Sequence, residues 1–236
     1  MANDYFKFKR FTIRQSNCAM KVGTDGTLLG GWAQASSGPC RILDIGTGTG
    51  LIALMMAQRF PQASVVGVDI DASAVNQARE NVNASPFADR IAIFETDICH
   101  FIADQSFDAI VCNPPFFDDD LICPENQRAI ARHTITLSYR ELLLSAFRLL
   151  SEDGRFSVII PANNRSNFES EALLAGFFLS RICLVKTTPI KAPKRCLIEL
   201  KKTAGSEIFN TCEIIEDSPG VRSVWYRQLT DDFYLR

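Results

Sequence analysis

One stretch of the chain constrains the fold more than any other. Residues 40–50 read Cys-Arg-Ile-Leu-Asp-Ile-Gly-Thr-Gly-Thr-Gly, an apolar run that ends in a carboxylate and three alternate glycines. The run from Arg41 to Ile45 is too short for a helix, and it is apolar on both faces like a central parallel strand. Glycines remove every Cβ from the turn that follows, so backbone N–H groups can approach a ligand there. The stretch predicts a strand, a tight turn and a helix beginning at Leu51.

The spacing of the glycines indicates which ligand this turn suits. A dinucleotide site has the pattern G-x-G-x-x-G, whereas Gly46, Gly48 and Gly50 form G-x-G-x-G, with Asp44 two residues ahead. A carboxylate suits a cationic ligand better than a pyrophosphate. S-adenosylmethionine carries a sulfonium, an ammonium and a carboxylate, so these four residues are candidates for binding it. Taken alone, the glycines are also compatible with a tight loop that binds nothing.

Two further carboxylates stand at the ends of predicted strands. Asp69 lies 19 residues beyond Gly50, where an acidic residue accepts the hydroxyls of a ribose in nucleoside-binding α/β folds. The competing role of helix cap belongs more naturally to Asp71. Asp97 ends the next strand, either as an acceptor for an adenine amino group or as a cap or turn residue.

The second informative stretch is Asn-Pro-Pro-Phe at residues 113–116, directly after a predicted strand. Pro114 and Pro115 fix φ at about −65° and donate no backbone hydrogen bond, so the Pro114 carbonyl has little conformational freedom. Asn113 adds an amide oxygen and Phe116 an aromatic face. Two acceptors can hold both N–H bonds of an sp² amine such as adenine N6, while the ring stacks on Phe116. The alternative is an ordinary turn at a strand end.

The composition indicates a globular protein, since 47% of the 236 residues are hydrophobic. No stretch approaches the roughly 20 apolar residues of a membrane span, and the first residues lack the layout of a signal peptide. We therefore expect a cytoplasmic protein with no membrane partner and no obligate protein partner. The eight cysteines form no C-x-x-C pair, so we expect no metal site and no redox motif.

The net charge of −2 argues against a nucleic-acid partner, but it hides two basic stretches. Residues 1–38 carry five Lys and Arg against two acidic residues, and residues 181–202 carry seven against one. Such clusters fit a grip on a phosphate backbone or a solvated face, and surface ion pairs are a further alternative for those near the Asn-Pro-Pro-Phe stretch. The candidates for substrate contacts are Lys7, Lys9, Arg10, Arg14, Lys21, Arg128, Arg132, Lys191, Lys194 and Arg195.

Hydrophobic periodicity predicts an alternating α/β order along the chain. It begins with a short β-element over 5–14, then a turn at Asp25-Gly26 and a helix. Predicted strands after the first cover 65–69, 91–95, 107–112, 155–160, 177–187, 195–202 and 212–216, and predicted helices cover 51–59, 72–83, 138–150 and 165–175.

With these motifs, the chain resembles class I S-adenosylmethionine-dependent methyltransferases that modify exocyclic or amide nitrogens, over roughly residues 38–202. The run Cys-Ala-Met-Lys-Val-Gly-Thr-Asp-Gly at 18–26 is similar to the signature of the bacterial tRNA1(Val) (adenine(37)-N6)-methyltransferase family. That family ends in an aromatic segment, as Phe233-Tyr234-Leu235 does here. It usually has Tyr where this chain has Phe116, a departure that keeps the stacking face.

The resemblance implies a Rossmann-like α/β fold, a mostly parallel sheet of seven strands with an antiparallel C-terminal hairpin. It implies methyl transfer from S-adenosylmethionine to N6 of adenine 37 in a tRNA anticodon loop, with S-adenosylhomocysteine as the product. The cofactor would lie at Asp44, Gly46, Asp69 and Asp97, and the target base at residues 113–116. We expect one methyltransferase domain over 1–236, with an N-terminal extension over 1–38, a core over 39–202 and a C-terminal extension over 203–236.

Other activities share parts of this pattern. Protein glutamine-N5 methyltransferases use Asn-Pro-Pro-Tyr on an amide nitrogen, but they carry a long helical N-terminal domain, and only 38 residues precede the core here. Methylation of guanine N2 in ribosomal RNA or of adenine N6 in DNA also fits. A non-catalytic nucleic-acid-binding domain is a different class, and the intact motif at 113–116 argues against it.

Overall fold

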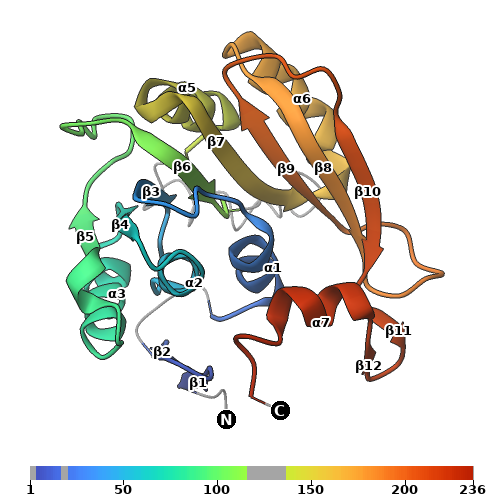
Figure 1. Cartoon of the computed structure of the whole chain (residues 1–236), viewed down its shortest axis with the longest axis horizontal. Coiled ribbons are helices and arrows are strands. Elements are labelled where there is room, and N and C mark those ends of the chain that lie inside the picture. Colours follow the sequence, from blue (N-terminus) through green and yellow to red (C-terminus); the bar gives the residue numbers. More distant parts are fainter. Residues whose placement is uncertain (1–3, 17–20, 116–136, 236) are drawn as a thin grey trace, which may run out of the picture.

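The computed structural model of the chain describes residues 4–16, 21–115 and 137–235. Its centre is an eight-stranded sheet with the order β10-β8-β9-β7-β6-β3-β4-β5 (Figure 1). These strands are β3 (Cys40–Ile45), β4 (Ala63–Asp69), β5 (Ile91–Glu95), β6 (Phe107–Cys112), β7 (Leu150–Pro161), β8 (Phe178–Lys186), β9 (Arg195–Lys201) and β10 (Phe209–Ile214). β9 runs antiparallel to both of its neighbours, and every other pair of neighbours is parallel.

The helices connect and cover these strands. They are α1 (Thr24–Trp32), α2 (Leu51–Arg59), α3 (Ala72–Asn83), α5 (Tyr139–Leu149), α6 (Arg165–Leu174) and α7 (Val224–Thr230), with 3-10 turns η1 (Ala88–Arg90) and η3 (Ala162–Asn164). Two small hairpins, β1 (Tyr5–Lys7) with β2 (Thr12–Arg14) and β11 (Glu216–Ser218) with β12 (Val221–Arg222), lie outside the main sheet. No helix within the described residues is long and apolar enough to cross a membrane.

The expected α/β fold is confirmed, with one strand more than the seven expected. β8 and β9 form the expected antiparallel hairpin. The eighth strand is β10, which pairs in parallel with β8 from Phe209 opposite Arg181 to Ile214 opposite Lys186. The sequence marks residues 212–216 as strand-like, but a period of two residues carries no information on which sheet edge a strand joins.

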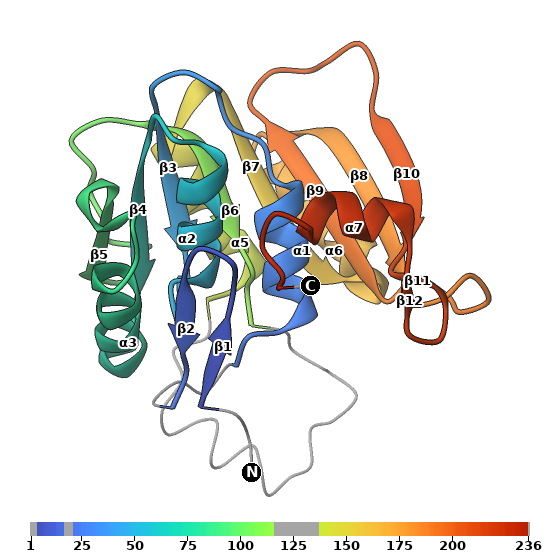
Figure 2. The same cartoon turned by 60° about the horizontal axis from the view of Figure 1, so that its bottom comes forward.

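Successive side chains of the central strands face two different helix layers. Ile42 of β3 packs in a cluster with α1, α2 and α3, whereas Leu43 and Ile45 pack in a second cluster with α5 and α6. Figure 2 shows α1, α2 and α7 on the near side of the sheet. A strand that is apolar at nearly every position is what a sheet covered on both faces requires.

The predicted N-terminal β-element is confirmed as the hairpin β1–β2, which joins the C-terminal segment. Phe8 forms a β-bridge with Tyr234, and their rings stack at 5.8 Å. On its other side, the Asn81 side chain of α3 bonds the backbone N–H and carbonyl of Arg14 and the carbonyl of Thr49 at 2.8 to 2.9 Å. The hairpin is therefore fixed against the glycine turn that follows β3.

The predicted turn at Asp25-Gly26 is wrong, because both residues lie in the first turn of α1. An acidic residue is favourable there, since the N-terminal end of a helix is electropositive. Asp25 also forms an ion pair with Arg195 of β9. Gly26 lets the helix pack closely, because a Cβ there would lie 3.0 Å from Leu51 Cδ2.

Candidate active site

The register of the sheet brings predicted site residues from four strands to one edge. The last residue of β6 pairs with the last residue of β3, which pairs with the last but one residue of β4. Asn113, Gly46 and Asp69 are therefore neighbours at the carboxyl edge, and Asp97 lies just beyond the end of β5. Parallel α/β sheets bind ligands at this edge.

The glycine turn between β3 and α2 leaves open space beside its backbone. The φ values of Gly46, Gly48 and Gly50 are +67°, +55° and +80°, in a region that residues other than glycine rarely adopt. A Cβ at Gly46 would meet no atom within 4 Å. The Gly48 N–H donates to Asp69 Oδ2 at 2.8 Å, so the turn is folded onto the end of β4. The turn can thus admit a ligand close to its backbone.

One carboxylate oxygen of Asp44 links this turn to the start of α2. Its Oδ2 accepts from Thr47 Oγ1 at 2.7 Å and from the Ala53 N–H at 3.1 Å, at the start of α2. Its Oδ1 is buried and has no hydrogen-bond partner among the described residues. Burial raises the pKa of Asp44 to about 7, and the charge of Asp69 acts in the same direction, whereas the two hydrogen bonds oppose it. Thr47 is not among the site residues that the sequence predicts, and its only signal is a hydroxyl three residues after a buried carboxylate.

The pKa of Asp44 leads to a prediction on stability. Since its folded pKa of about 7 exceeds the usual 3.8, the folded protein keeps a proton between about pH 4 and 7 that the unfolded chain has lost. The stabilisation from this group is full at low pH and is lost as the pH rises towards 7. Urea unfolding at pH 5 and pH 8 should therefore show wild type losing on the order of 2 to 3 kcal/mol relative to Asp44→Asn. A difference that stays constant with pH would contradict the prediction.

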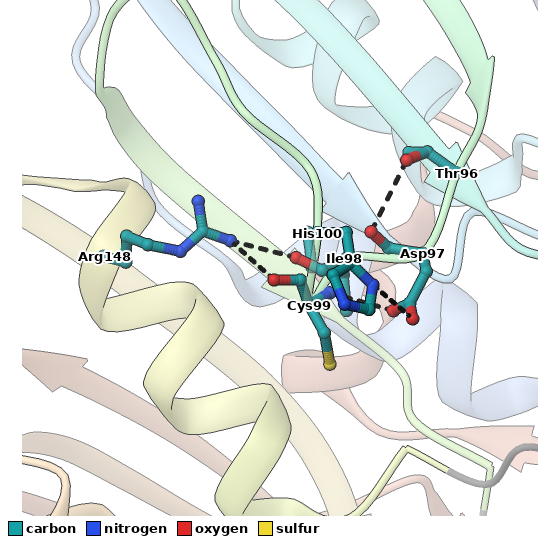
Figure 3. A network of polar contacts seen from close by, with 6 residues as sticks. All are labelled: Thr96, Asp97, Ile98, Cys99, His100 and Arg148. Atoms are coloured by element: carbon teal, nitrogen blue, oxygen red, sulfur yellow. Dashed lines mark hydrogen bonds and ion pairs between the residues drawn. The ribbon is translucent and has the colours of Figure 1, made fainter.

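Asp97 occupies a tight turn after β5 (Figure 3). Its Oδ1 accepts from the Cys99 N–H at 2.9 Å, and its Oδ2 lies 3.1 Å from Nδ1 of His100. The Cys99 N–H, followed by His100, lowers the pKa of Asp97, so the carboxylate is ionised at neutral pH. The turn role considered from the sequence is therefore present. The side chain is also 29% exposed at the carboxyl edge, where it can accept from a ligand.

Asn113 offers an acceptor that the described part of the protein leaves unused. Its Oδ1 is buried and has no hydrogen-bond partner among the described residues. Pro114 is buried and Pro115 is exposed, and Phe116 lies outside the described residues. Burial, with the charges of Asp44 and Asp69, raises the pKa of the adjacent Cys112 thiol well above its usual range. This cysteine is therefore protonated and unsuited to act as a nucleophile.

The basic candidates divide into exposed side chains and side chains with partners. Lys191 and Lys194 are exposed in the loop between β8 and β9, and the Lys194 carbonyl accepts from Ala162 just beyond β7. Arg195, in contrast, is held by Asp25. The remaining described candidates, Lys7, Lys9, Arg10, Arg14 and Lys21, are exposed, although Lys9 Nζ donates to the Asp231 carbonyl and Arg10 covers the ring of Phe87 at 5.0 Å. Arg128 and Arg132 lie outside the described residues.

The donor set at this edge fits S-adenosylmethionine. Asp69 and Asp97 carry carboxylates that can accept from a ribose and from an adenine amine, and Gly46 leaves the backbone open. Asp44 Oδ1, which has no hydrogen-bond partner among the residues the structure describes, is suited to a cationic group. Within the described ranges, no three His, Cys, Asp or Glu side chains are grouped so that they could hold a metal ion.

Comparisons with known proteins agree with this geometry. The Methyltransferase small domain family matches residues 32–187. A tRNA1(Val) (adenine(37)-N6)-methyltransferase of Phocaeicola vulgatus is 52% identical, and the match covers 100% of this chain and 99% of that protein. A protein of the same name from Porphyromonas gingivalis is 47% identical over 99% of this chain and 96% of its own length. A crystal structure of a predicted O-methyltransferase from Agrobacterium tumefaciens shares the fold, with a TM-score of 0.67 and 19% identity. The match covers 89% of this chain and 96% of that one.

The fold and the carboxyl-edge site define a class I methyltransferase that uses S-adenosylmethionine as its methyl donor. Within that class, the chain belongs to the tRNA1(Val) (adenine(37)-N6)-methyltransferase family, with which it is similar along its full length.

Proposed function

We propose that this protein transfers a methyl group from S-adenosylmethionine to N6 of an adenine in a tRNA anticodon loop, adenine 37 of tRNA1(Val). The observation that carries the proposal is the buried Oδ1 of Asn113 beside the glycine turn, which has no hydrogen-bond partner in the described part of the chain and is suited to an N–H donor. The names of the full-length relatives support the choice of base and of tRNA. We also propose that residues 1–236 act as one domain, in the cytoplasm and without an obligate protein partner.

The chemistry requires the protein to orient a poor nucleophile. The lone pair of adenine N6 is delocalised into the ring, so the amine must be held with that lone pair facing the methyl group. We assign one N–H bond of the amine to Asn113 Oδ1 and the other to the Pro114 carbonyl, whose backbone the prolines restrain. Phe116 would stack on the base, and that residue lies outside the described ranges.

When bound, S-adenosylmethionine supplies an electrophilic methyl group on a sulfonium. Transfer of that methyl group to N6 would leave the electron pair of the broken bond from carbon to sulfur on the thioether of S-adenosylhomocysteine, while Asn113 and the Pro114 carbonyl hold the amine. N6 then loses one proton to solvent. The chain supplies acceptors that fix the amine, and the protonated Cys112 thiol fits a direct transfer without a covalent enzyme intermediate.

An unpaired base is the expected substrate, because N6 within a helix is paired and cannot face the sulfonium. An anticodon loop offers such bases at a low cost of extrusion. Exposed lysines of the β8–β9 loop lie at the same carboxyl edge as Asn113, next to the end of β7. We assign them to contacts with phosphates, which contribute affinity without reading the base sequence.

Replacing Lys191 and Lys194 together by Ala should raise the KM for tRNA and lower the slope of log affinity against log salt by about 1 to 2. The affinity for the cofactor should stay unchanged, because neither residue belongs to the cofactor site. A matched control replaces Lys201 and Lys202 together by Ala. It removes the same charge at the opposite end of β9. Equal effects of the two pairs on tRNA binding would contradict a specific role for the β8–β9 loop.

The function is tested by incubating the protein with labelled S-adenosylmethionine and total tRNA, ribosomal RNA, DNA or protein, followed by nucleoside or amino-acid analysis. We expect N6-methyladenine in tRNA only. Label in DNA, in ribosomal RNA or on glutamine would overturn the substrate and leave the pocket assignment standing. Mapping the mark in tRNA from cells with and without the protein then tests the position.

A further inference from the structure

An arginine side chain of a neighbouring helix bonds the backbone of the turn that carries Asp97. Arg148, exposed near the end of α5, donates from Nη1 to the Phe101 carbonyl at 2.7 Å. Its Nη2 donates to the carbonyls of Ile98 at 3.1 Å and Cys99 at 3.5 Å (Figure 3). The planar guanidinium presents two nitrogens side by side, so one can bond the Phe101 carbonyl while the other bonds the carbonyls of Ile98 and Cys99. The guanidinium therefore fixes the backbone of the turn.

One peptide group links this guanidinium to the Asp97 carboxylate. The carbonyl of Ile98 accepts from Arg148 Nη2, and the N–H of the same peptide, on Cys99, donates to Asp97 Oδ1 at 2.9 Å. Because a peptide group is planar, rotating it would break both bonds together. A donor on the carbonyl also polarises the peptide and strengthens the bond that its N–H makes. The orientation of the carboxylate thus depends on Arg148, although the two side chains share no direct bond.

We propose that Arg148 is a positioning residue, which acts through the Ile98–Cys99 peptide to aim the Asp97 carboxylate at the exocyclic amine of the cofactor's adenine. The inference rests on the proposed function, since it places that adenine at Asp97. Without the guanidinium, the peptide keeps only its bond to Asp97 Oδ1, and the carboxylate is held in its direction less firmly, with His100 Nδ1 at 3.1 Å from Oδ2 as a further side-chain contact. The site then loses its preference for an amino group at that position of the purine.

A second arginine provides a matched control with the same chemistry. Arg90 donates to the carbonyls of Ala57, Phe60 and Ala63 at 2.8 to 3.2 Å. This cluster lies at the opposite edge of the sheet, where β4 and β5 begin. Loss of either arginine removes a guanidinium that bridges three carbonyls, so a purely structural effect should be similar at the two places.

The test compares the affinity of S-adenosylhomocysteine with that of S-inosylhomocysteine by calorimetry. The inosine form carries a carbonyl oxygen where adenine carries its amine, so the wild type should prefer the adenosine form by about tenfold to hundredfold. Arg148→Ala should lower this ratio by about tenfold, whereas Arg90→Ala should leave it unchanged even if both variants melt earlier. Arg148→Lys keeps the charge but loses the fork, so its ratio should fall as well.

The variant Asp97→Asn distinguishes a failure of the role of Arg148 from a failure of the proposed cofactor site. An amide can donate to the inosine carbonyl, so this variant should shift the preference towards S-inosylhomocysteine. If Asp97→Asn leaves the ratio unchanged, the adenine does not lie at Asp97 and the cofactor assignment fails with the inference. If Asp97→Asn shifts the ratio but Arg148→Ala keeps the wild-type value, only the role of Arg148 fails. If Arg148→Ala lowers the affinity ratio but Arg148→Lys keeps the wild-type ratio, the charge of residue 148 matters and the fork of donors on the peptide does not, which would overturn the proposed mechanism.

Discussion

Replacing Asn113 by Ala should lower the single-turnover rate of methyl transfer to tRNA by on the order of a thousandfold. The affinity for S-adenosylmethionine should change by less than about twofold, because the role we propose for the amide is to hold the target amine and not the cofactor. The physical reason is the buried Oδ1 of Asn113, which has no hydrogen-bond partner among the described residues. Rapid mixing of labelled cofactor with tRNA measures the rate, and calorimetry measures the affinity.

Two further variants sharpen this prediction. Asn113→Gln keeps the amide but moves it by one methylene, so it should also lose most of the rate if position is what matters. Cys112→Ala alters the adjacent residue, whose thiol is protonated, and should keep most of the rate. A folded Asn113→Ala protein that works within about tenfold of wild type would contradict the role of Asn113, given the size that orientation effects reach. A dead Cys112→Ala protein that still folds would point to a covalent route.

The part of the fold that could be predicted is the part that local sequence encodes. The helix after the glycine turn runs from Leu51 to Arg59, as predicted, because its glycines and apolar run are adjacent in the chain. The strand from Phe107 to Cys112 also has its predicted bounds, since the prolines after it end the pairing. Asp71 caps α3 through the Ser73 N–H, as its position before an apolar run indicates.

Contacts between distant residues could not be predicted in this way. Arg195 carries the same charge as its neighbours in a basic stretch, and only the folded chain shows that Asp25, 170 residues away in sequence, neutralises it. Arg148 likewise lies on the exposed side of an amphipathic helix, where an arginine usually signals solvent. Its partners lie 47 to 50 residues earlier. No local pattern specifies such pairs.

The sequence also could not predict which partner each oxygen of one carboxylate would have. The sequence predicts that Asp44 contacts a cationic ligand, and that contact stays a prediction. The structure gives one of its oxygens to Thr47 and Ala53, and leaves the other buried without a described partner. Spacing places a carboxylate at a strand end, but only packing decides how each oxygen is used.

Replacing Asp69 by Ala should weaken the binding of S-adenosylmethionine by about 30-fold to 100-fold, the loss expected for a bidentate, charge-assisted contact. In the folded chain, Asp69 Oδ2 accepts from the Gly48 N–H at 2.8 Å and Oδ1 accepts from the Asp71 N–H at 3.0 Å. A carboxylate has about four lone-pair sites, so each oxygen can still accept one ribose hydroxyl. The substitution removes both acceptors and also frees the glycine turn from the end of β4. Calorimetry with S-adenosylmethionine measures the loss.

Asp71 is a matched control for Asp69, because it is a carboxylate two residues away with a purely local task. Its Oδ1 accepts from the Ser73 N–H at 2.9 Å at the start of α3, so Asp71→Ala should cost about 1 kcal/mol of stability through the lost cap. Its cofactor affinity should stay close to that of wild type. Asp69→Asn should lie between wild type and Asp69→Ala, because an amide keeps one acceptor oxygen and loses the charge. Equal losses of affinity in Asp69→Ala and Asp71→Ala would mean that both act through the backbone between β4 and α3, and Asp69 would then have no direct contact with the ribose.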